Sequence, residues 1–292
     1  MGGPSVFSRC HNDSKHHFPL GGVRMSYSDY MDDYISVQQF DEAYEKIKSD
    51  LVQGKSANSD KCTIILGGQP GAGKSSFYEI RDDLLDYIPI NGDEYRRFHP
   101  NYQQILKSDP EHYAERTQTF SNKIVETLIS DLGAEGYNLI IEGTLRNPEV
   151  PIRTCQFLKD KGYEPELIVV ACDAETAWKS TIKRANALKN LGLAPRLVPI
   201  DIYNNTVNQI PRSLDRIEAE NCFKDIIIIN RDGDILYKTG QNEKASDILT
   251  KELNLDNWRQ KLHQYEEFFI KEKIAILQLS LEHSKGLDFD EH

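Results

Sequence analysis

One stretch of this 292-residue chain combines glycines, a lysine and two hydroxyl groups at a spacing that suits phosphate chemistry. An apolar run over 64–66 leads into a G-x-x-x-x-G-K-S motif, and a helix-compatible segment over 76–86 follows. Strand, glycine-rich turn, lysine, hydroxyl and helix in this order are the context of a P-loop. Backbone N–H groups in such a loop form a nest for anions, and the following helix presents its positive end to them. The residues expected to bind a nucleotide are Gly68, Gln69, Pro70, Gly71, Ala72, Gly73, Lys74, Ser75 and Ser76.

Two side chains of this motif have separate expected roles. Lys74 should reach the β- and γ-phosphates, and Ser75 should offer a hard oxygen to Mg²⁺. The alternative interpretation is a glycine-rich turn that binds no ligand. Such a turn would not need the complete G-x-x-x-x-G-K-S motif between a strand and a helix. The sequence therefore predicts a protein that binds a nucleoside triphosphate and Mg²⁺.

A carboxylate, Asp93, comes shortly after the second strand-like run at 87–90. Ligands of open α/β sheets bind at the carboxyl ends of the strands, where the P-loop and Asp93 would both lie. A carboxylate at that edge can accept the proton of an attacking hydroxyl. Asp93 could instead be a surface turn residue or the N-cap of a helix beginning at Glu94, although Arg96 clusters with it.

The third strand-like run, at 138–141, delivers a second acid at its tip. Glu142 occupies the place of a Walker-B acid and could hold Mg²⁺ directly or through water. Thr144 and Arg146 follow on the loop and could face a substrate. For Arg146, a solvated loop charge is the competing interpretation.

Strand-like and helix-like segments alternate along the chain. The expected strands are Cys62–Leu66, Tyr87–Ile90, Asn138–Ile141, Leu167–Ala171 and Ile226–Ile229, and the expected helices cover 37–52, 75–86, 111–132, 150–161, 173–189 and 199–219. This alternation favours an α/β fold of the P-loop kinase type, with a mostly parallel sheet flanked by helices. The unbroken apolar run 226–229 predicts an interior strand, followed by a turn at 230–233 and a short edge strand at 235–237.

The C-terminal part of the chain has a different pattern. Trp258, Leu262, Tyr265 and Phe269 follow a 4-3-4 spacing, which predicts one long amphipathic helix. We expect this helix to pack on its own domain, and a partner-binding face is the alternative. The predicted organisation is a tail over 1–35, expected to be disordered, a P-loop kinase domain over 36–255, and the C-terminal helix over 256–292.

Composition narrows the class of function. The net charge is −11, which argues against a nucleic-acid-binding protein because such proteins need a basic face. No apolar run is long enough to span a membrane, and no secretory signal is recognisable, so we expect no membrane partner. The five cysteines are scattered and odd in number, which is typical of a reducing compartment. A cytoplasmic location is therefore expected.

Together these pieces resemble the zeta toxin family of bacterial toxin–antitoxin kinases. The matching segments are Leu66–Ser75, Asn91–Arg96 with His99-Pro100, Gly136–Arg146, Val150-Pro151 and Asp160–Glu164. The resemblance spans residues 36–255, and the order and spacing of the segments make it more specific than a P-loop alone.

The resemblance implies a kinase that transfers the γ-phosphate of ATP to the 3′-hydroxyl of the amino sugar in UDP-N-acetylglucosamine. Such an enzyme acts as a toxin, because its product blocks cell-wall precursor synthesis. The resemblance implies that Asp93 is the catalytic base and that Arg184 and Arg196 face the phosphates beside Lys74. The residues that would contact the acceptor are Asp93, Arg96, Glu126, Thr144 and Arg146. It also implies a small helical antitoxin that blocks the ATP site.

The chain departs from the family's usual wording over 185–193, which leaves the alignment of Arg196 and the identity of the acceptor open. One alternative is a P-loop phosphotransferase acting on another nucleotide sugar, a dinucleotide or an antibiotic. A second alternative, from a different class, is a nucleotide-gated interaction protein that transfers no phosphate. An acceptor-side carboxylate such as Asp93 favours the kinase.

Overall fold

Six strands form a single sheet in the order β2-β3-β1-β4-β5-β6, in a computed structural model that describes residues 35–79, 81–191 and 195–286. The strands are β1 Cys62–Gly67, β2 Ile88–Ile90, β3 Leu139–Glu142, β4 Glu164–Val170, β5 Ile226–Ile229 and β6 Ile235–Lys238. The first five strands run parallel, and β6 pairs antiparallel with β5. The predicted mostly parallel α/β sheet is confirmed, including the short antiparallel strand at its edge.

The centre of the sheet is the strand that leads into the P-loop. Strand β1 lies between β3 and β4, and its residues Ile64, Ile65 and Leu66 are buried. A strand covered on both faces needs an unbroken apolar run, which this segment has. Strand β5 is also interior, as predicted, although Ile227 stays partly exposed.

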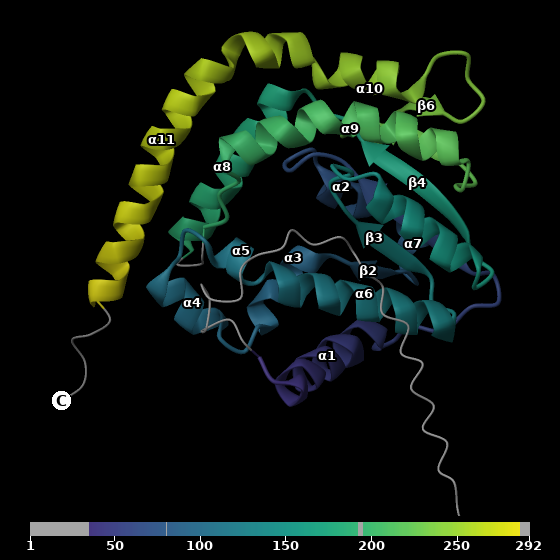
Figure 1. Cartoon of the computed structure of the whole chain (residues 1–292), viewed down its shortest axis with the longest axis horizontal. Helices are drawn as coiled ribbons and strands as arrows, with labels where there is room; N and C mark the ends of the chain where they lie inside the picture. The colour runs from purple at the N-terminus through teal and green to yellow at the C-terminus, as the bar shows by residue number, and fades with distance from the viewer. Residues whose placement is uncertain (1–34, 80, 192–194, 287–292) are drawn as a thin grey trace, which may run out of the picture.

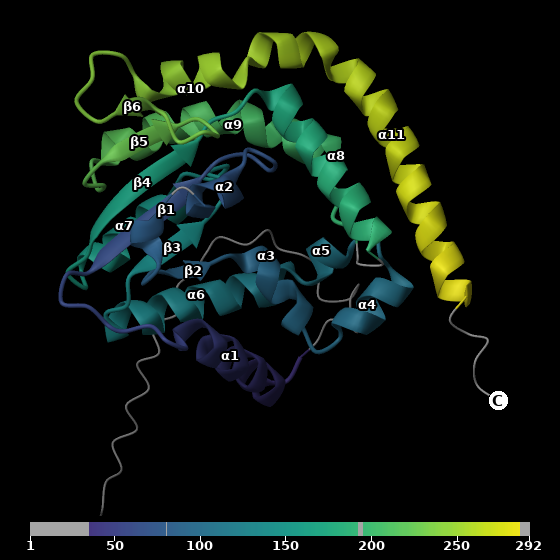
Figure 2. The same ribbon diagram turned by 180° about the vertical axis from the view of Figure 1, so that it is seen from behind.

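Helices cover both faces of the sheet. The helices are α1 Val37–Val52, α2 Lys74–Glu79, α3 Gly92–Tyr95, α4 Tyr102–Ser108, α5 Tyr113–Arg116, α6 Gln118–Glu135, α7 Glu149–Lys159, α8 Ala174–Asn190, α9 Ile200–Glu220, α10 Ala245–Leu253 and α11 Leu255–Gly286, with short 3₁₀ turns η2 Asp82–Leu84 and η3 Arg96–Phe98. In Figures 1 and 2, α1 and α6 lie on one side of the sheet and α8, α9 and α10 on the other. The P-loop therefore opens between two layers of helices.

The helices of the structure differ from the sequence prediction in three ways. The helix expected over 111–132 is divided at Thr117 into α5 and α6, where the Thr117 hydroxyl donates to the Tyr113 carbonyl (2.7 Å). The helix expected over 75–86 is shorter, because α2 ends at Glu79 and η2 follows. Helices α4 and α10 lie in segments for which the sequence showed no helical pattern, because both are short.

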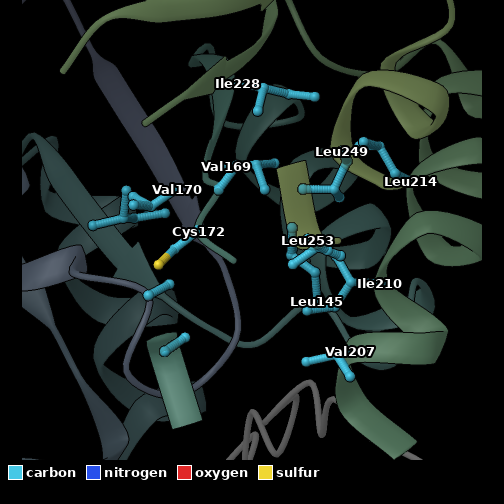
Figure 3. Packing of buried hydrophobic residues seen from close by; sticks show 14 of the residues in the cluster. Leu145, Val169, Val170, Cys172, Val207, Ile210, Leu214, Ile228, Leu249 and Leu253 are labelled. Atoms are coloured by element: carbon cyan, nitrogen blue, oxygen red, sulfur yellow. The ribbon is translucent and has the colours of Figure 1, made fainter. Parts of the chain in front are cut away.

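Two hydrophobic clusters of buried residues pack around the sheet. The larger one joins β1, β4 and β5 to α8, α9, α10 and α11, and Figure 3 shows part of it, with Val169 and Ile228 facing Leu214 and Leu249. The smaller one joins β2 and β3 to α1 and α6. Because both faces of the sheet are covered by apolar side chains, the carboxyl edge of the strands is left to carry the polar residues.

The long C-terminal helix packs on the larger layer. Trp258 of α11 is fully buried, its ring centroid lies 6.0 Å from that of Trp178 in α8, and its indole N–H donates to Asn204 of α9 (3.0 Å). Farther along α11, Lys273 pairs with Glu111, which precedes α5. Figure 1 shows α11 continuing past α8 toward α4. The helix thus contacts both sides of the molecule, while the predicted N-terminal tail lies outside the described residues except for residue 35.

Candidate active site

The loop between β1 and α2 has the backbone geometry of a phosphate cradle. Gly68, Gly71 and Gly73 have φ angles of 141°, 76° and 99°. A Cβ on Gly71 would lie 2.0 Å from the Ala177 carbonyl oxygen of α8, and one on Gly68 would lie 2.7 Å from that of Val170. Only glycine combines these angles with such close packing. The loop that the motif predicted is therefore pressed against α8 and β4.

Polar contacts hold the first residues of the cradle in place. The buried side chain of Gln69 donates to the Cys172 carbonyl (2.6 Å), and the Ala72 N–H donates to the Gln69 carbonyl (3.1 Å). Ser75 stands exposed in the first turn of α2, and the Ser76 N–H donates to the Gly73 carbonyl (3.0 Å). The Ser75 hydroxyl is thus open to solvent beside the loop.

Lys74 places its ammonium group over the cradle. Its Nζ donates to the Gly68 carbonyl (2.8 Å). Burial lowers the pKa of Lys74 to about 8, the nearby carboxylates of Glu142 and Asp93 oppose this shift, and the charges of Arg184 and Arg196 add to it. These four groups therefore lie close enough to Lys74 for their charges to act on it. Five ionisable residues from distant segments meet at one place.

Asp93 follows β2 and carries two guanidinium partners. Its Oδ1 accepts from Arg96 Nε (3.2 Å), and its Oδ2 is ion-paired with Arg196. Burial alone would raise the pKa of Asp93, but Arg196 and Arg96 outweigh it and hold the pKa below its ordinary value. The N-cap of α3 is Asn91, whose side chain accepts from the Asp93 N–H (3.1 Å). The Asp93 carboxylate is therefore not used as that cap.

Arg96 points into the protein. It is 7% exposed, and its guanidinium donates to the Ala114 carbonyl, to Thr117 Oγ1 (3.2 Å) and to Gln118 Oε1 (2.6 Å) as well as to Asp93. These acceptors occupy both terminal nitrogens and Nε. In the free protein Arg96 is therefore directed at Asp93 and at these other acceptors, and its expected contact with the acceptor substrate stays a prediction.

Glu142 ends β3 beside the strand that enters the P-loop. In the parallel register Glu142 pairs with Leu66 of β1, the residue just before Gly67 and Gly68. Glu142 therefore lies level with the end of β1, where the P-loop begins. Its Oε1 accepts from the Tyr78 hydroxyl of α2 (2.9 Å). The hydroxyl partner orients the carboxylate, a contact that the sequence pattern did not reveal because Tyr78 is 64 residues away.

The loop after β3 presents the two residues expected to face an acceptor. Thr144 and Arg146 are exposed, and between them Leu145 is buried with φ of 57°. A left-handed leucine is uncommon and costs about 1 kcal/mol or more. The missing side chain of Gly67 makes the room, because a Cβ there would lie 2.2 Å from Leu145. Burial of Leu145 thus turns Thr144 and Arg146 outward. The Ser213 hydroxyl of α9 also donates to the Arg146 carbonyl (3.1 Å).

The remaining expected residues come from helices. Glu126 of α6 is partly exposed, and burial raises the pKa of its carboxyl group while Arg153 and Lys123 oppose the shift. Arg184 of α8 is exposed, and loss of solvent around its guanidinium together with the charge of Arg196 lowers its pKa. Arg184 therefore belongs to the cluster around Lys74.

One residue of the site was missed by sequence reasoning. Arg231, in the turn after β5, donates through Nε to the Ala72 carbonyl (3.1 Å) and through Nη2 to the Gly71 carbonyl. The sequence showed only a turn at 230–233, and nothing in it connects that turn to a loop 160 residues earlier. Contacts of this range depend on the fold.

The sheet with a central P-loop strand, the cradle and the acidic residue on the neighbouring strand define a P-loop kinase-like protein. Comparison with known proteins agrees and goes further. The family model described as zeta toxin matches residues 45–242. The chain belongs to the zeta toxin family, kinase-like toxins of toxin–antitoxin systems.

Two similar sequences and two solved structures show how close the relation is. Toxin PezT of Streptococcus pneumoniae serotype 4 is 32% identical over 239 residues, which is 81% of this chain and 92% of that protein. Toxin zeta of Streptococcus pyogenes is 32% identical, covering 74% of this chain and 77% of that protein. The structure of the PezAT chromosomal toxin–antitoxin system of S. pneumoniae matches with a TM-score of 0.69 at 29% identity, covering 84% of this chain and 98% of that one. A complex of AvrRxo1-ORF1 and -ORF2 with ATP shares the fold (TM-score 0.51, 12% identity, 74% and 71% covered).

Three further expectations can be set against the described residues. Within them, no group of three or more His, Cys, Asp or Glu residues could hold a metal by itself. Mg²⁺ usually keeps several waters and one or two carboxylates beside substrate phosphates, so the expected site does not need such a group. No described helix is both long and apolar enough to cross a membrane. The four described cysteines are free thiols.

Proposed function

We propose that this protein is an ATP-dependent kinase that phosphorylates the 3′-hydroxyl of the amino sugar in UDP-N-acetylglucosamine. The observation that carries the proposal is the meeting of Asp93, Glu142, Arg184 and Arg196 around Lys74 above the P-loop. A nucleotide-binding loop alone would need no acceptor-side carboxylate. The phosphorylated product could not be used for cell-wall precursor synthesis, and this loss of precursor would make the protein a toxin.

In the proposed reaction Asp93 is the general base. The acceptor hydroxyl oxygen forms a bond to the γ-phosphorus of ATP, its proton passes to an Asp93 carboxylate oxygen, and the bond from the γ-phosphorus to the β,γ-bridging oxygen breaks, leaving ADP. Arg196 now holds Asp93, so it must release that carboxylate to reach the phosphates. A base with a lowered pKa is weak, and transfer of Arg196 to the phosphate would restore its basicity.

The cations of the cluster act on the phosphates. Lys74 would bridge the β- and γ-phosphates, as its position over the Gly68 carbonyl allows. Arg184 and Arg196 would hold the γ-phosphoryl oxygens, on which charge is spread in the transition state. Their planar forks can bind two oxygens at once, which an ammonium group does not do.

The residues present also fit a magnesium ion. Ser75 is exposed beside the cradle, and Glu142 stands at the tip of the adjacent strand, so a hydroxyl and a carboxylate are available. Mg²⁺, when bound, would neutralise phosphate charge. Tyr78 would hold the Glu142 carboxylate in orientation through its hydroxyl.

Glu126, Thr144 and Arg146 are assigned to the acceptor. Thr144 and Arg146 are turned outward by the buried Leu145, at the carboxyl edge where ligands of such sheets bind. Substitution of Glu126 or Arg146 by Ala should raise the KM for the nucleotide sugar and leave ATP affinity unchanged. Arg96 supports this side indirectly by fixing Asp93.

An antitoxin partner is part of the proposal. A toxin of this class would need to be silenced in its own cell, and the PezAT structure is of a toxin–antitoxin system. We expect a small helical protein that covers the ATP site, and a cytoplasmic location where ATP and nucleotide sugars occur.

The test is incubation with ATP, Mg²⁺ and a panel of nucleotide sugars, dinucleotides and aminoglycoside-type antibiotics, read by mass spectrometry. A mass gain of one phosphate on UDP-N-acetylglucosamine, absent with Lys74→Ala, is the expected result. Phosphorylation of another compound would keep the kinase and replace the acceptor. ATP binding without phosphate transfer to any compound would favour a nucleotide-gated interaction protein instead.

A further inference from the structure

Arg231 joins three separate elements behind the phosphate cradle. It stands in the turn between β5 and β6 and donates to the carbonyls of Gly71 and Ala72 in the P-loop. Its Nη2 also donates to the Ser180 hydroxyl of α8 (3.1 Å), which in turn donates to the Thr176 carbonyl (2.9 Å). Within the described part of the chain, Arg231 forms no ion pair with a carboxylate, so its charge is directed at the loop.

The direction of the two carbonyls determines where the N–H groups of the loop point. In a planar trans peptide unit the N–H lies opposite to the C=O. Because the carbonyls of Gly71 and Ala72 point at Arg231, the N–H groups of Ala72 and Gly73 point away from it. The Ala72 N–H closes the turn onto the Gln69 carbonyl, which leaves the Gly73 N–H to face the cradle.

We propose that Arg231 is a positioning residue that fixes the P-loop in its phosphate-binding form before a nucleotide arrives. This inference rests on the proposed function, because it requires the loop to bind the triphosphate of ATP. Hydrogen bonds from a cation to the carbonyls polarise the peptide units and make their N–H groups better donors to phosphate. The fixed positive charge behind the loop also attracts the triphosphate.

The chemistry of the contact calls for arginine. The guanidinium group presents Nε and Nη2 in one plane and reaches three acceptors from two elements. A lysine would keep the charge but not the fork. The side chain also packs on Gly73, where a Cβ would lie 3.1 Å from the Arg231 Cγ.

The contact with Ser180 extends the effect to the helix that bears a phosphate-facing arginine. Ser180 is four residues, about one helical turn, before Arg184 on α8. Arg231 thus fixes the distance between the cradle and the helix that carries Arg184. Loss of Arg231 should affect ATP binding first and leave the acceptor side, which lies on β2, β3 and α6, unaffected.

The experiment compares Arg231→Gln, Arg231→Lys and Ser180→Ala with the full-length wild type. Affinity for a non-hydrolysable ATP analogue with Mg²⁺ is measured by calorimetry, and the acceptor KM by the transfer assay. We expect Arg231→Gln to weaken analogue binding about tenfold or more, because it removes charged hydrogen bonds. The analogue affinity of Arg231→Lys should lie between those of Arg231→Gln and wild type. Ser180→Ala should weaken analogue binding by about threefold or less. The acceptor KM should stay within about twofold.

The matched control is Arg216→Gln on α9, where the arginine pairs with Glu220 on the surface. This control should change neither the analogue affinity nor the acceptor KM. Thermal melting shows whether each variant is folded. If Arg231→Gln does not fold, the inference is tested with Arg231→Lys and Ser180→Ala. Wild-type analogue affinity in folded Arg231→Lys and Ser180→Ala, or equal losses in analogue affinity and acceptor KM, would overturn the inference.

The wild-type measurements separate this inference from the proposed function. If wild type binds the analogue but phosphorylates no nucleotide sugar, the acceptor assignment fails while Arg231 is still judged by analogue affinity. If wild type does not bind the analogue, the ATP assignment and the role of Arg231 fail together.

Discussion

At the scale of single residues, the pairing of Asp93 shows that its carboxylate is not the cap of α3, one of the roles that its sequence position allowed. Asn91 already caps α3, and the Asp93 carboxylate is directed at Arg96 and Arg196. In the proposed reaction the base would sit among cations, because the same cations would hold the phosphate beside it. The same cations keep its carboxylate ionised in the free protein.

Replacement of Asp93 by Asn is expected to cut turnover by about 10²–10⁴-fold, the usual effect of removing a general base. ATP affinity should change little, since Lys74 and the loop remain. The melting temperature should fall only slightly, because Asn91 keeps the cap and Arg96 keeps three other acceptors. Steady-state kinetics and a thermal melt check this. A large drop in melting temperature with unchanged turnover would mean that Asp93 is structural.

Lys74 should make ATP binding depend on pH. Its pKa of about 8 in the free protein is lowered mainly by burial, and phosphate charge would raise it in the complex. Binding near pH 9 must therefore take up close to one proton, whereas binding near pH 7 takes up little. ATP affinity should fall above about pH 8, by up to tenfold per pH unit. Calorimetry in two buffers of different ionisation enthalpy measures the uptake, and Lys74→Arg, which stays protonated, should abolish it. Equal uptake by Lys74→Arg and wild type would assign the proton elsewhere.

At the scale of elements, the sequence predicted what is encoded locally. The P-loop is a continuous motif, and the apolar runs of β1 and β5 are continuous too, so both could be recognised. The order of the strands could not, because it depends on which runs pair across long separations. The predicted helix is divided at Thr117, and the inward-turned Arg96 donates to Thr117 and Gln118 at this point, more than 20 residues away in the sequence. Sequence proximity to Asp93 did not reveal that the Arg96 side chain is buried and directed at these partners.

The contact between α8 and α11 should give acid-dependent stability. Glu175, in the first turn of α8, pairs with Lys179 (2.6 Å) and with Lys261 of α11 (3.0 Å), and these partners lower the pKa of its carboxyl to about 2. A carboxyl whose pKa is lower in the folded state stabilises the fold above its unfolded pKa, and loses that contribution as pH falls toward about 2.

Glu175→Gln is therefore expected to lower the free energy of unfolding by about 1–2 kcal/mol at neutral pH, allowing for screening by solvent. The difference from wild type should shrink near pH 3. Urea unfolding at both pH values measures it, and Glu243→Gln on the exposed loop before α10 is the control. A difference that is the same at both pH values would show that the loss comes from packing rather than charge.

At the scale of the whole molecule, the site lies between two layers with separate hydrophobic clusters. Lys74, Arg184 and Arg196 come from the larger layer around β1 and α8, whereas Asp93 and Glu126 stand on the layer of α3 and α6. The ion pair between Arg196 and Asp93 joins the two layers directly at the site. In a chain with a net charge of −11, we expect this local group of cations to be the place that attracts anionic substrates.

This ion pair predicts that the two substrates bind cooperatively. The γ-phosphate of ATP competes with Asp93 for Arg196, and its greater charge should win, which frees the carboxylate for the acceptor hydroxyl. A non-hydrolysable ATP analogue should therefore tighten binding of UDP-N-acetylglucosamine, by about 5-fold or more if the coupling is of ordinary size. Calorimetric titrations of the sugar nucleotide with and without the analogue give the coupling, and the reverse titration must give the same factor. Arg196→Ala should remove it, since the Asp93 Oδ2 is then unpaired from the start, while Oδ1 keeps its bond from Arg96. Arg184→Lys should keep it, because Arg184 forms no ion pair with Asp93 within the described residues. Equal coupling in Arg196→Ala and wild type would show that ATP does not act through this pair.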